Sequence, residues 1–155
     1  MSINTIIVDL KISNVGSVLN MIKRLGFEAK VSSNIKDIQK ASRLILPGVG
    51  SFDQGMYALE SLNLIKVLNN KVINEKVPIL GICLGMHLLA TKGYENNKET
   101  NGLNIIPGLV KKLKKNSEFK LPHIGWNQIV IKEKNKIFKN ILDNSDFYFI
   151  HSYEF

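Results

Sequence analysis

Short runs of apolar residues alternate with helically spaced apolar positions along the first half of the chain. Residues 4–10 form a nearly continuous apolar run, the pattern of a strand buried on both faces of a sheet. The following segments predict a helix that ends before Gly26, an outer strand, a short helix and a third strand, at residues 18–25, 27–31, 35–41 and 43–46. Strands and helices in this order predict an α/β fold with a mainly parallel central sheet.

The second half of the chain has a different pattern. Helical spacing over residues 64–72 leads into an apolar strand, and the polar residues 94–101 beyond it predict a surface loop. Alternating runs then predict a smaller, more antiparallel portion, with strands at residues 109–113, 128–131 and 147–150 and turns at Pro107-Gly108 and around Asn116.

The apolar strand of the second half ends at Cys83, the only cysteine of the chain, and a helical pattern begins at once. Gly81 and Gly85 flank this residue as G-x-C-x-G, the cysteine counterpart of the G-x-S-x-G nucleophile elbow. At such a bend the thiol stands exposed at the tip of the sheet, on a strained and often left-handed backbone. A helix that begins there favours the thiolate over the thiol.

Two neighbours of Cys83 fit the same interpretation. The N–H of Leu84 points toward the position where a carbonyl oxygen becomes negative during attack, which makes it half of an oxyanion hole. His87 lies one helical turn along the same face. The alternative is that Cys83 is a small buried residue at a strand end, as free cysteines often are. The paired glycines and the abrupt change of pattern favour the elbow.

A glycine-rich turn, Pro47-Gly48-Val49-Gly50-Ser51-Phe52, follows the third strand at the carboxyl edge of the sheet, where open α/β sheets bind ligands. A phosphate-binding loop is one interpretation, but the turn lacks the G-x-G-x-x-G spacing and the Walker lysine and hydroxyl. A structural turn without a ligand is another. A glycine peptide also lets a ligand approach closely and can turn its N–H toward it.

Composition restricts the classes of function. With 155 residues, 45% of them apolar, the chain predicts a single soluble domain with a substantial core. No apolar run approaches the roughly 20 residues that span a bilayer, and the N-terminus lacks a leader pattern, so we expect a cytoplasmic protein and no membrane contact. One cysteine forms no internal disulfide and, without partner residues, no metal site.

A net charge of +8 raises the question of an anionic partner. Of the 21 basic residues only Arg24 and Arg43 are arginines, and the lysines are spread along the chain. The one dense cluster, residues 111–115, has no interleaved aromatic residue on which a base would stack. We therefore interpret it as a solvated segment and expect no nucleic acid; an acidic protein face or a phosphorylated substrate is left open.

The sequence G-I-C-L-G-M-x-L-L around Cys83 closely resembles the nucleophile segment of the triad-type, class I glutamine amidotransferases. Further motifs occur in order along the whole chain: Asn14 followed by Ser17-Val18, the turn at 47–52, Gly102-Leu103 with Ile106-Pro107-Gly108, Pro122-His123-Ile124-Gly125-Trp126-Asn127, and Phe147-Tyr148-Phe149-Ile150-His151-Ser152-Tyr153. Together they resemble the glutaminase subunits of imidazole glycerol phosphate synthase, from the histidine pathway. The resemblance implies a three-layer, flavodoxin-like fold and one amidotransferase domain over residues 1–155 that lacks the last elements.

The same resemblance implies the chemistry. Cys83 attacks the side-chain amide of glutamine, N–H groups of the Val49–Gly50 turn and of Leu84 hold the oxyanion, and hydrolysis of the thioester releases glutamate. Ammonia passes to a (β/α)₈-barrel cyclase subunit that makes imidazole glycerol phosphate, and no cofactor or metal is implied. The implied substrate contacts are Gly48, Gly50, His87, Ser152 and Tyr153, and the implied partner contacts are Asn14, His123 and Trp126.

Two departures from the family pattern bear on activity. Family members carry glutamine four residues after the nucleophile, where this chain has His87, and an imidazole lacks the paired donor and acceptor of an amide. The family's catalytic H-x-E lies beyond the H-S-Y motif, and no H-x-E occurs in this chain, which stops at Phe155. General acid–base groups contribute about 10² to 10⁴ in rate, so we expect a severe defect from this chain alone. His87, His123 and His151 are candidate replacements, each with a packed or surface histidine as the alternative.

Three classes of function follow. The first is the glutaminase subunit. The second is a glutaminase-deficient scaffold that docks a cyclase using free ammonia; the helper of a related sugar-amidating enzyme is a further alternative. The third is the cysteine hydrolases and chaperone-like proteins of flavodoxin-like fold, many of which have histidine directly after the cysteine, whereas this chain has Leu84.

Overall fold

The computed structural model describes residues 4–114, 120–133 and 135–155. The chain forms two compact units, Met1–Lys111 together with Phe155, and Lys112–Glu154. The expectation of one domain over residues 1–155 stays a prediction. The described residues contain no helix that is both long and apolar enough to cross a bilayer.

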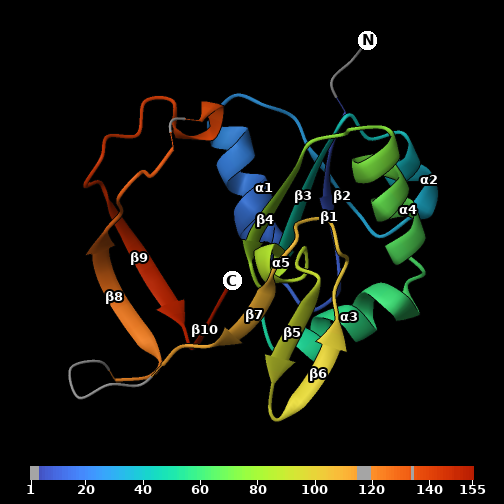
Figure 1. The fold of residues 1–155 in the computed structure, drawn as a ribbon. Helices are drawn as coiled ribbons and strands as arrows, with labels where there is room; N and C mark the ends of the chain where they lie inside the picture. Colours follow the sequence, from blue (N-terminus) through green and yellow to red (C-terminus); the bar gives the residue numbers. More distant parts are fainter. Residues whose placement is uncertain (1–3, 115–119, 134) are drawn as a thin grey trace. The chain divides into compact units, whose positions relative to one another are not determined.

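The first unit is built on four parallel strands in the order β2-β1-β3-β4 (Figure 1). The strands are β1 (Thr5–Val8), β2 (Lys30–Ser32), β3 (Arg43–Gly48) and β4 (Ile79–Cys83). The mainly parallel sheet predicted from the apolar runs is therefore present. The predicted outer strand is the edge strand β2, although it begins only at Lys30.

Helices cover both faces of this sheet, α1 (Val15–Arg24) on one and α2 (Ile35–Gln39) with α4 (Ile65–Asn69) on the other (Figure 1). Asparagine caps two of them. The side chain of Asn14 accepts from the N–H of Ser17 at 3.3 Å, and that of Asn34 accepts from Lys36 at 2.8 Å. The result is the predicted three-layer α/β arrangement.

The segment predicted as one helix over residues 64–72 is α4 followed by a π-helical turn, η1 (Asn70–Asn74). The turn carries the buried Lys71, whose ammonium donates to the carbonyl oxygen of Gln39 at 2.9 Å and pairs with Glu75 at 2.5 Å. Because Gln39 ends α2, this lysine satisfies a helix-terminal carbonyl and ties α2 to η1.

The helix α3 (Phe52–Ser61), directly after the glycine turn, was absent from the sequence prediction. Phe52, Met56 and Leu59 are buried on one side of it. Their spacing of four and three residues is the helical signal that the prediction overlooked.

The prediction of a surface loop at residues 94–101 is wrong. They belong to an antiparallel hairpin of β5 (Lys92–Glu95) and β6 (Lys98–Asn101), and β7 (Leu109–Lys112) pairs with β5 in parallel. Asn96 and Asn97 form the turn, with φ of 52° and 59°. Two consecutive left-handed residues are the geometry that joins hairpin strands most closely, and asparagine tolerates it.

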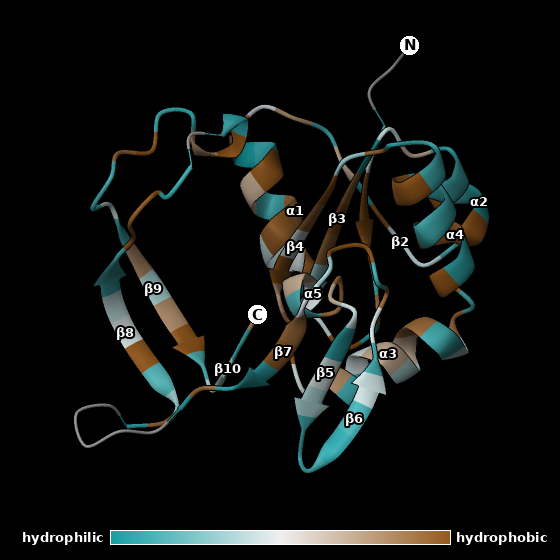
Figure 2. Ribbon diagram, in the orientation of Figure 1, coloured by the Kyte–Doolittle hydropathy of each residue, from teal (hydrophilic) through white to brown (hydrophobic). Residues whose placement is uncertain are grey.

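The core of the first unit lies around the central strands, where Figure 2 shows apolar residues concentrated on β1 and β3. Ile6, Ile7 and Val8 are fully buried, as a strand covered on both faces requires. The outer strand β4 differs, because its apolar side chains Leu80 and Ile82 are 43% and 37% exposed.

This contrast gives a stability prediction. Leu44→Ala is expected to lower the free energy of unfolding by about 2–5 kcal/mol, because Leu44 is 1% exposed and its truncation leaves a cavity. The matched change Leu80→Ala on the neighbouring strand should cost about 1 kcal/mol. Urea unfolding followed by circular dichroism measures both. Equal losses would contradict the exposed position of Leu80.

The second unit contains an antiparallel pair, β8 (His123–Gln128) and β9 (Asp146–His151), the 3₁₀ turn η2 (Lys136–Phe138) and the short β10 (Tyr153–Glu154). The antiparallel second half was predicted correctly. However, the strand expected at residues 128–131 ends at Gln128 and starts at His123. The turn expected around Asn116 lies outside the described residues.

Candidate active site

Cys83 ends β4 and precedes α5 (Leu84–His87), with φ 54° and ψ −121°. Positive φ is uncommon for a residue with a side chain, and such strain gathers at functional sites. The thiol is exposed. The predicted bend, with its left-handed and accessible cysteine, is therefore present.

The two glycines of the elbow permit close packing rather than positive φ. A Cβ on Gly85 would lie 1.7 Å from the carbonyl oxygen of Leu46 on β3, and one on Gly81 would lie 2.5 Å from the Cα of Met86. The start of α5 therefore lies directly against the backbone of β3 and β4. Any larger residue at these positions would force the strand and the helix apart.

The glycine turn lies beside the cysteine. In the parallel ladder of β3 and β4, Gly48 is the register partner of Cys83. Neighbouring strands are about 4.8 Å apart, so the backbone that follows Gly48 begins next to the thiol. Val49 is 54% exposed, and Gly50 has φ 103°, a conformation that favours glycine. Gly48 therefore lies beside Cys83 and Leu84, and Val49 and Gly50 follow it directly; the site roles of these residues stay predictions.

The helix predicted after the cysteine is present and short. It spans four residues and ends at His87, and residues 88–90 continue as a turn and a bend. His87 is half-buried at the end of this turn.

Glu95 is a residue of this region that the sequence reasoning missed. Its carboxylate accepts a hydrogen bond from the backbone N–H of Phe52 at 2.7 Å. Phe52 lies two residues after Gly50, so a charged group from β5 reaches the base of the glycine turn. The predicted loop over residues 94–101 hid this contact, because a strand fixes the direction of Glu95 and a loop does not.

His123 and His151 in the second unit contact each other. His123 Nδ1 lies 2.9 Å from His151 Nε2, and His123 Nε2 lies 2.8 Å from Asn127 Oδ1. His151 Nδ1 lies 2.9 Å from the carbonyl oxygen of Tyr153, to which it must donate. Every ring nitrogen of the pair thus has a partner, which counts against either histidine as a replacement general base.

The residues predicted to contact a partner are divided between the two units. Asn14 caps α1 in the first unit. In the second unit Trp126 is 70% exposed, and its ring meets that of Tyr148 edge-on at 5.6 Å. His123 lies three residues before Trp126 and stacks on Phe149 at 5.3 Å, on the opposite face of β8.

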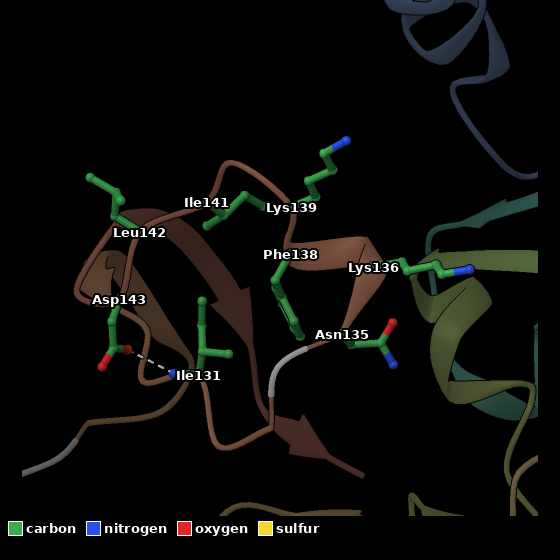
Figure 3. A pocket seen from close by; sticks show the side chains of 8 residues that line it. All are labelled: Ile131, Asn135, Lys136, Phe138, Lys139, Ile141, Leu142 and Asp143. Atoms are coloured by element: carbon green, nitrogen blue, oxygen red, sulfur yellow. Dashed lines mark hydrogen bonds between the residues drawn. The ribbon is translucent and has the colours of Figure 1, made fainter.

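The second unit also has an open hollow of ≈ 590 Å³ beside η2 (Figure 3). Apolar side chains and a polar rim line it: Ile131, Asn135, Lys136, Phe138, Lys139, Ile141, Leu142 and Asp143. The carboxylate of Asp143 accepts from the N–H of Ile131 at 2.8 Å, which closes the loop between β8 and β9. None of the predicted site residues lines this hollow.

Metal binding is not suggested by side-chain grouping. Within the ranges that the structure describes, no three His, Cys, Asp or Glu side chains gather as a metal-binding cluster.

Ser152 and Tyr153, two of the predicted substrate contacts, lie at the end of the second unit. The carbonyl oxygen of Ser152 accepts from the N–H of Leu113 at 2.9 Å.

Comparison with known proteins identifies relatives along nearly the whole chain. The family Glutamine amidotransferase class-I matches residues 6–155. The chain is 50% identical to imidazole glycerol phosphate synthase subunit HisH 2 of Methanococcus maripaludis, over 95% of this chain and 72% of the relative. It is 43% identical to subunit HisH of Pelagibacter ubique, over 98% of this chain and 75% of the relative.

A solved structure described as a crystal structure of glutamine amidotransferase has the same fold, with a TM-score of 0.68. The match covers 96% of this chain and 70% of that structure at 16% sequence identity. With the elbow cysteine and the glycine turn in register, these matches show that the chain belongs to the class-I glutamine amidotransferase family, among its HisH members.

Proposed function

We propose that this chain is the glutamine-hydrolysing subunit of an imidazole glycerol phosphate synthase and supplies ammonia to a cyclase subunit in histidine biosynthesis. The observation that carries the proposal is the exposed, left-handed Cys83 in register with Gly48, at the start of a glycine turn. The names of the relatives, at 50% and 43% identity, support the choice of complex and pathway. A single domain and a cytoplasmic location stay predictions.

The proposed chemistry is acyl transfer to sulfur. The thiolate of Cys83 attacks the side-chain amide carbon of glutamine, and the carbonyl oxygen takes the negative charge. The N–H groups of Leu84 and of the Val49–Gly50 turn stabilise that charge, because they are already oriented when it develops. The carbon–nitrogen bond then breaks, the nitrogen takes a proton and leaves as ammonia, and water hydrolyses the thioester to glutamate and free thiol.

The predicted substrate contacts are Gly48, Gly50, His87, Ser152 and Tyr153. Glycine backbone at positions 48 and 50 allows the amide of glutamine to approach closely. Toward the substrate, the imidazole of His87 offers one hydrogen bond where the amide of a glutamine residue at this position would offer two. We therefore expect this chain to bind its glutamine substrate more weakly than family members that carry a glutamine residue here.

The proposed partner is a (β/α)₈-barrel cyclase that covers the face of the β8–β9 pair containing Trp126. That face is apolar and exposed, with Ile124, Trp126, Tyr148 and Ile150 side by side in the strand register. Exposed aromatic residues of this kind are enriched where partners dock. Asn14 stays a predicted contact. His123 lies on the opposite face of β8, so a partner contacts it only if that partner covers both faces of the strand.

A second candidate function is a scaffold that docks the cyclase and uses free ammonia. One observation favours it: the ring nitrogens of His123 and His151 are engaged with each other and with neighbouring oxygens.

The test of the proposed function is covalent labelling by a diazo-ketone analogue of glutamine. We expect one adduct per chain at Cys83, located by peptide mass spectrometry, with free glutamine protecting the thiol. Cys83→Ala should take up no label. A chain that reacts with iodoacetamide but not with the glutamine analogue, even in the presence of the cyclase, would contradict glutamine recognition at this thiol.

A further inference from the structure

We propose that Gln54 is a positioning residue that keeps the N–H of Ser51 bound to α3 and thereby determines which N–H groups of the glycine turn stabilise an oxyanion. The inference rests on the proposed function, because it concerns the turn that takes the negative charge in that reaction. Gln54 acts through the backbone of the turn, and we assign it no contact with the substrate.

Gln54 is the third residue of the ten-residue helix α3, and Ser51 is the residue that caps this helix. The two form a capping box, in which the side chain of each residue bonds to the backbone N–H of the other. The N–H of Ser51 donates to Gln54 Oε1 at 3.5 Å. This N–H is therefore directed toward the helix.

The same oxygen also packs against the glycine turn. A Cβ on Gly50 would lie 3.1 Å from Gln54 Oε1, so the amide of Gln54 contacts the residues on both sides of the Gly50–Ser51 peptide. The N–H and the carbonyl of a trans peptide point in opposite directions, so the carbonyl oxygen of Gly50 points away from Gln54. The preceding peptide joins this plane at the Cα of Gly50, where φ is 103°. Fixing one peptide therefore restricts the other.

Both ends of the turn are attached to the rest of the first unit. Gly48 is paired in the ladder with β4, and a Cβ on it would lie 2.9 Å from the backbone nitrogen of Gly85. At the other end, the ring of Phe52 is 1% exposed and lies on Gly93, where an added Cβ would be 2.5 Å from the ring. Only two residues lie between Gly48 and Ser51. With Ser51 bound to α3, the oxyanion donors are limited to this short segment.

The neighbouring carboxylate is not a ready replacement for Gln54. Asp53 Oδ1 accepts from the hydroxyl of Ser51 at 2.5 Å, and Asp53 Oδ2 pairs with the ammonium of Lys98 at 3.8 Å. Without the amide oxygen of Gln54, the N–H of Ser51 would lose its partner and the Gly50–Ser51 peptide would be free to rotate. The donors of the turn would then be less well oriented when charge develops at the substrate.

The experiment compares Gln54→Met and Gln54→Glu in the full chain, using the diazo-ketone analogue of glutamine as the probe. Methionine keeps the length of the side chain beside Gly50 but lacks the oxygen, and it should label Cys83 about 5-fold more slowly at saturation, as expected for loss of a helix cap. The half-saturating concentration should not change. Glutamate keeps an oxygen acceptor and should label nearly as fast as the unchanged chain. Glu60→Met, at the exposed end of the same helix, is the matched control and should leave the rate unchanged.

A second readout follows the turn without any reaction. In ¹⁵N-labelled chain the amide signals of Gly50 and Ser51 should shift in Gln54→Met, and the N–H of Ser51 should exchange faster with solvent. Both should return nearly to normal in Gln54→Glu. A residue that only stabilises α3 would change the thermal unfolding of the chain and leave the saturating rate of labelling as it is.

Four results would overturn the proposal. The first is unchanged labelling in Gln54→Met, and the second is equal slowing in both variants, which assigns the effect to packing against Gly50. The third is a raised half-saturating concentration with the saturating rate unchanged, since that indicates direct contact with the substrate. The fourth is an unmoved Ser51 signal in Gln54→Met. If the unchanged chain takes up no label, the proposed function fails, and the amide signals still decide whether Gln54 orients the turn.

Discussion

Replacing Cys83 with serine is expected to abolish glutamine-dependent synthesis by the complex of this chain with its cyclase, while ammonium salts still support the cyclase. The loss should be about 10³-fold or more, because a hydroxyl is a far weaker nucleophile than a thiol. Cys83 is exposed and ends a strand at the tip of the sheet, so this small change leaves the packing around it intact. Product formation is measured with glutamine and, separately, with ammonium chloride.

The two nitrogen sources separate the possible outcomes of that experiment. Loss of activity with glutamine alone supports Cys83 as the nucleophile. Loss with both sources means that the substitution disturbs docking, which would contradict a purely chemical role. If the unchanged complex is active only with ammonium, the chain acts as the scaffold. The serine variant will then have the same activity as the unchanged chain.

The parallel half of the fold could be predicted because burial on both faces leaves a clear trace in sequence. Ile6, Ile7 and Val8 form an apolar run typical of a covered strand, and the strand has 0% exposure at all three. The elbow could be predicted for a related reason. Gly81 and Gly85 are spaced around Cys83 in a pattern that few other structures need, and both glycines prove to be sites of close backbone approach.

The hairpin of β5 and β6 could not be predicted because its strands are polar. Its stability draws on cross-strand pairs such as Lys92 with Glu99 at 2.5 Å, and Tyr94 also bonds to Glu99. The Glu99 contacts hold its pKa below the usual range, through the hydrogen bond from Lys92 and then that from Tyr94. Polar pairs of this kind leave no apolar periodicity, so the segment reads as a loop and the position of Glu95 is lost with it.

The residues of the candidate site could be predicted, but the tertiary contacts that hold its glycine turn could not. Gly48, Gly50 and Cys83 occur in separate segments whose proximity follows from parallel strand order. The contact between the glycine turn and β5 depends instead on a tertiary hydrogen bond from Phe52 to Glu95, and nothing in either local sequence indicates that bond. Helix α3, which begins at Phe52, was itself overlooked.

Gly85→Ala is expected to prevent native packing of the elbow. An added Cβ would lie 1.7 Å from the carbonyl oxygen of Leu46, about half of a normal contact distance, and it would be 3.3 Å from the carbonyl carbon of Pro47. Backbone atoms cannot move aside as a side chain can, so α5 must leave β3. We expect a loss of more than about 4 kcal/mol in the free energy of unfolding. Since single domains are stable by only about 5–15 kcal/mol, the variant should be largely unfolded or partly folded at 37 °C.

Gly16→Ala is the matched control for that substitution. Gly16 lies in α1, and a Cβ there would meet only the side-chain oxygen of Asn14, at the ordinary contact distance of 3.7 Å. This variant should gain about 0.4–1 kcal/mol, because alanine restricts the unfolded chain more than glycine does. Thermal unfolding followed by circular dichroism then gives shifts of opposite sign for the same chemical change. A Gly85→Ala variant that unfolds like the unchanged chain would show that α5 does not lie against β3, and the geometry around Cys83 would lose its basis.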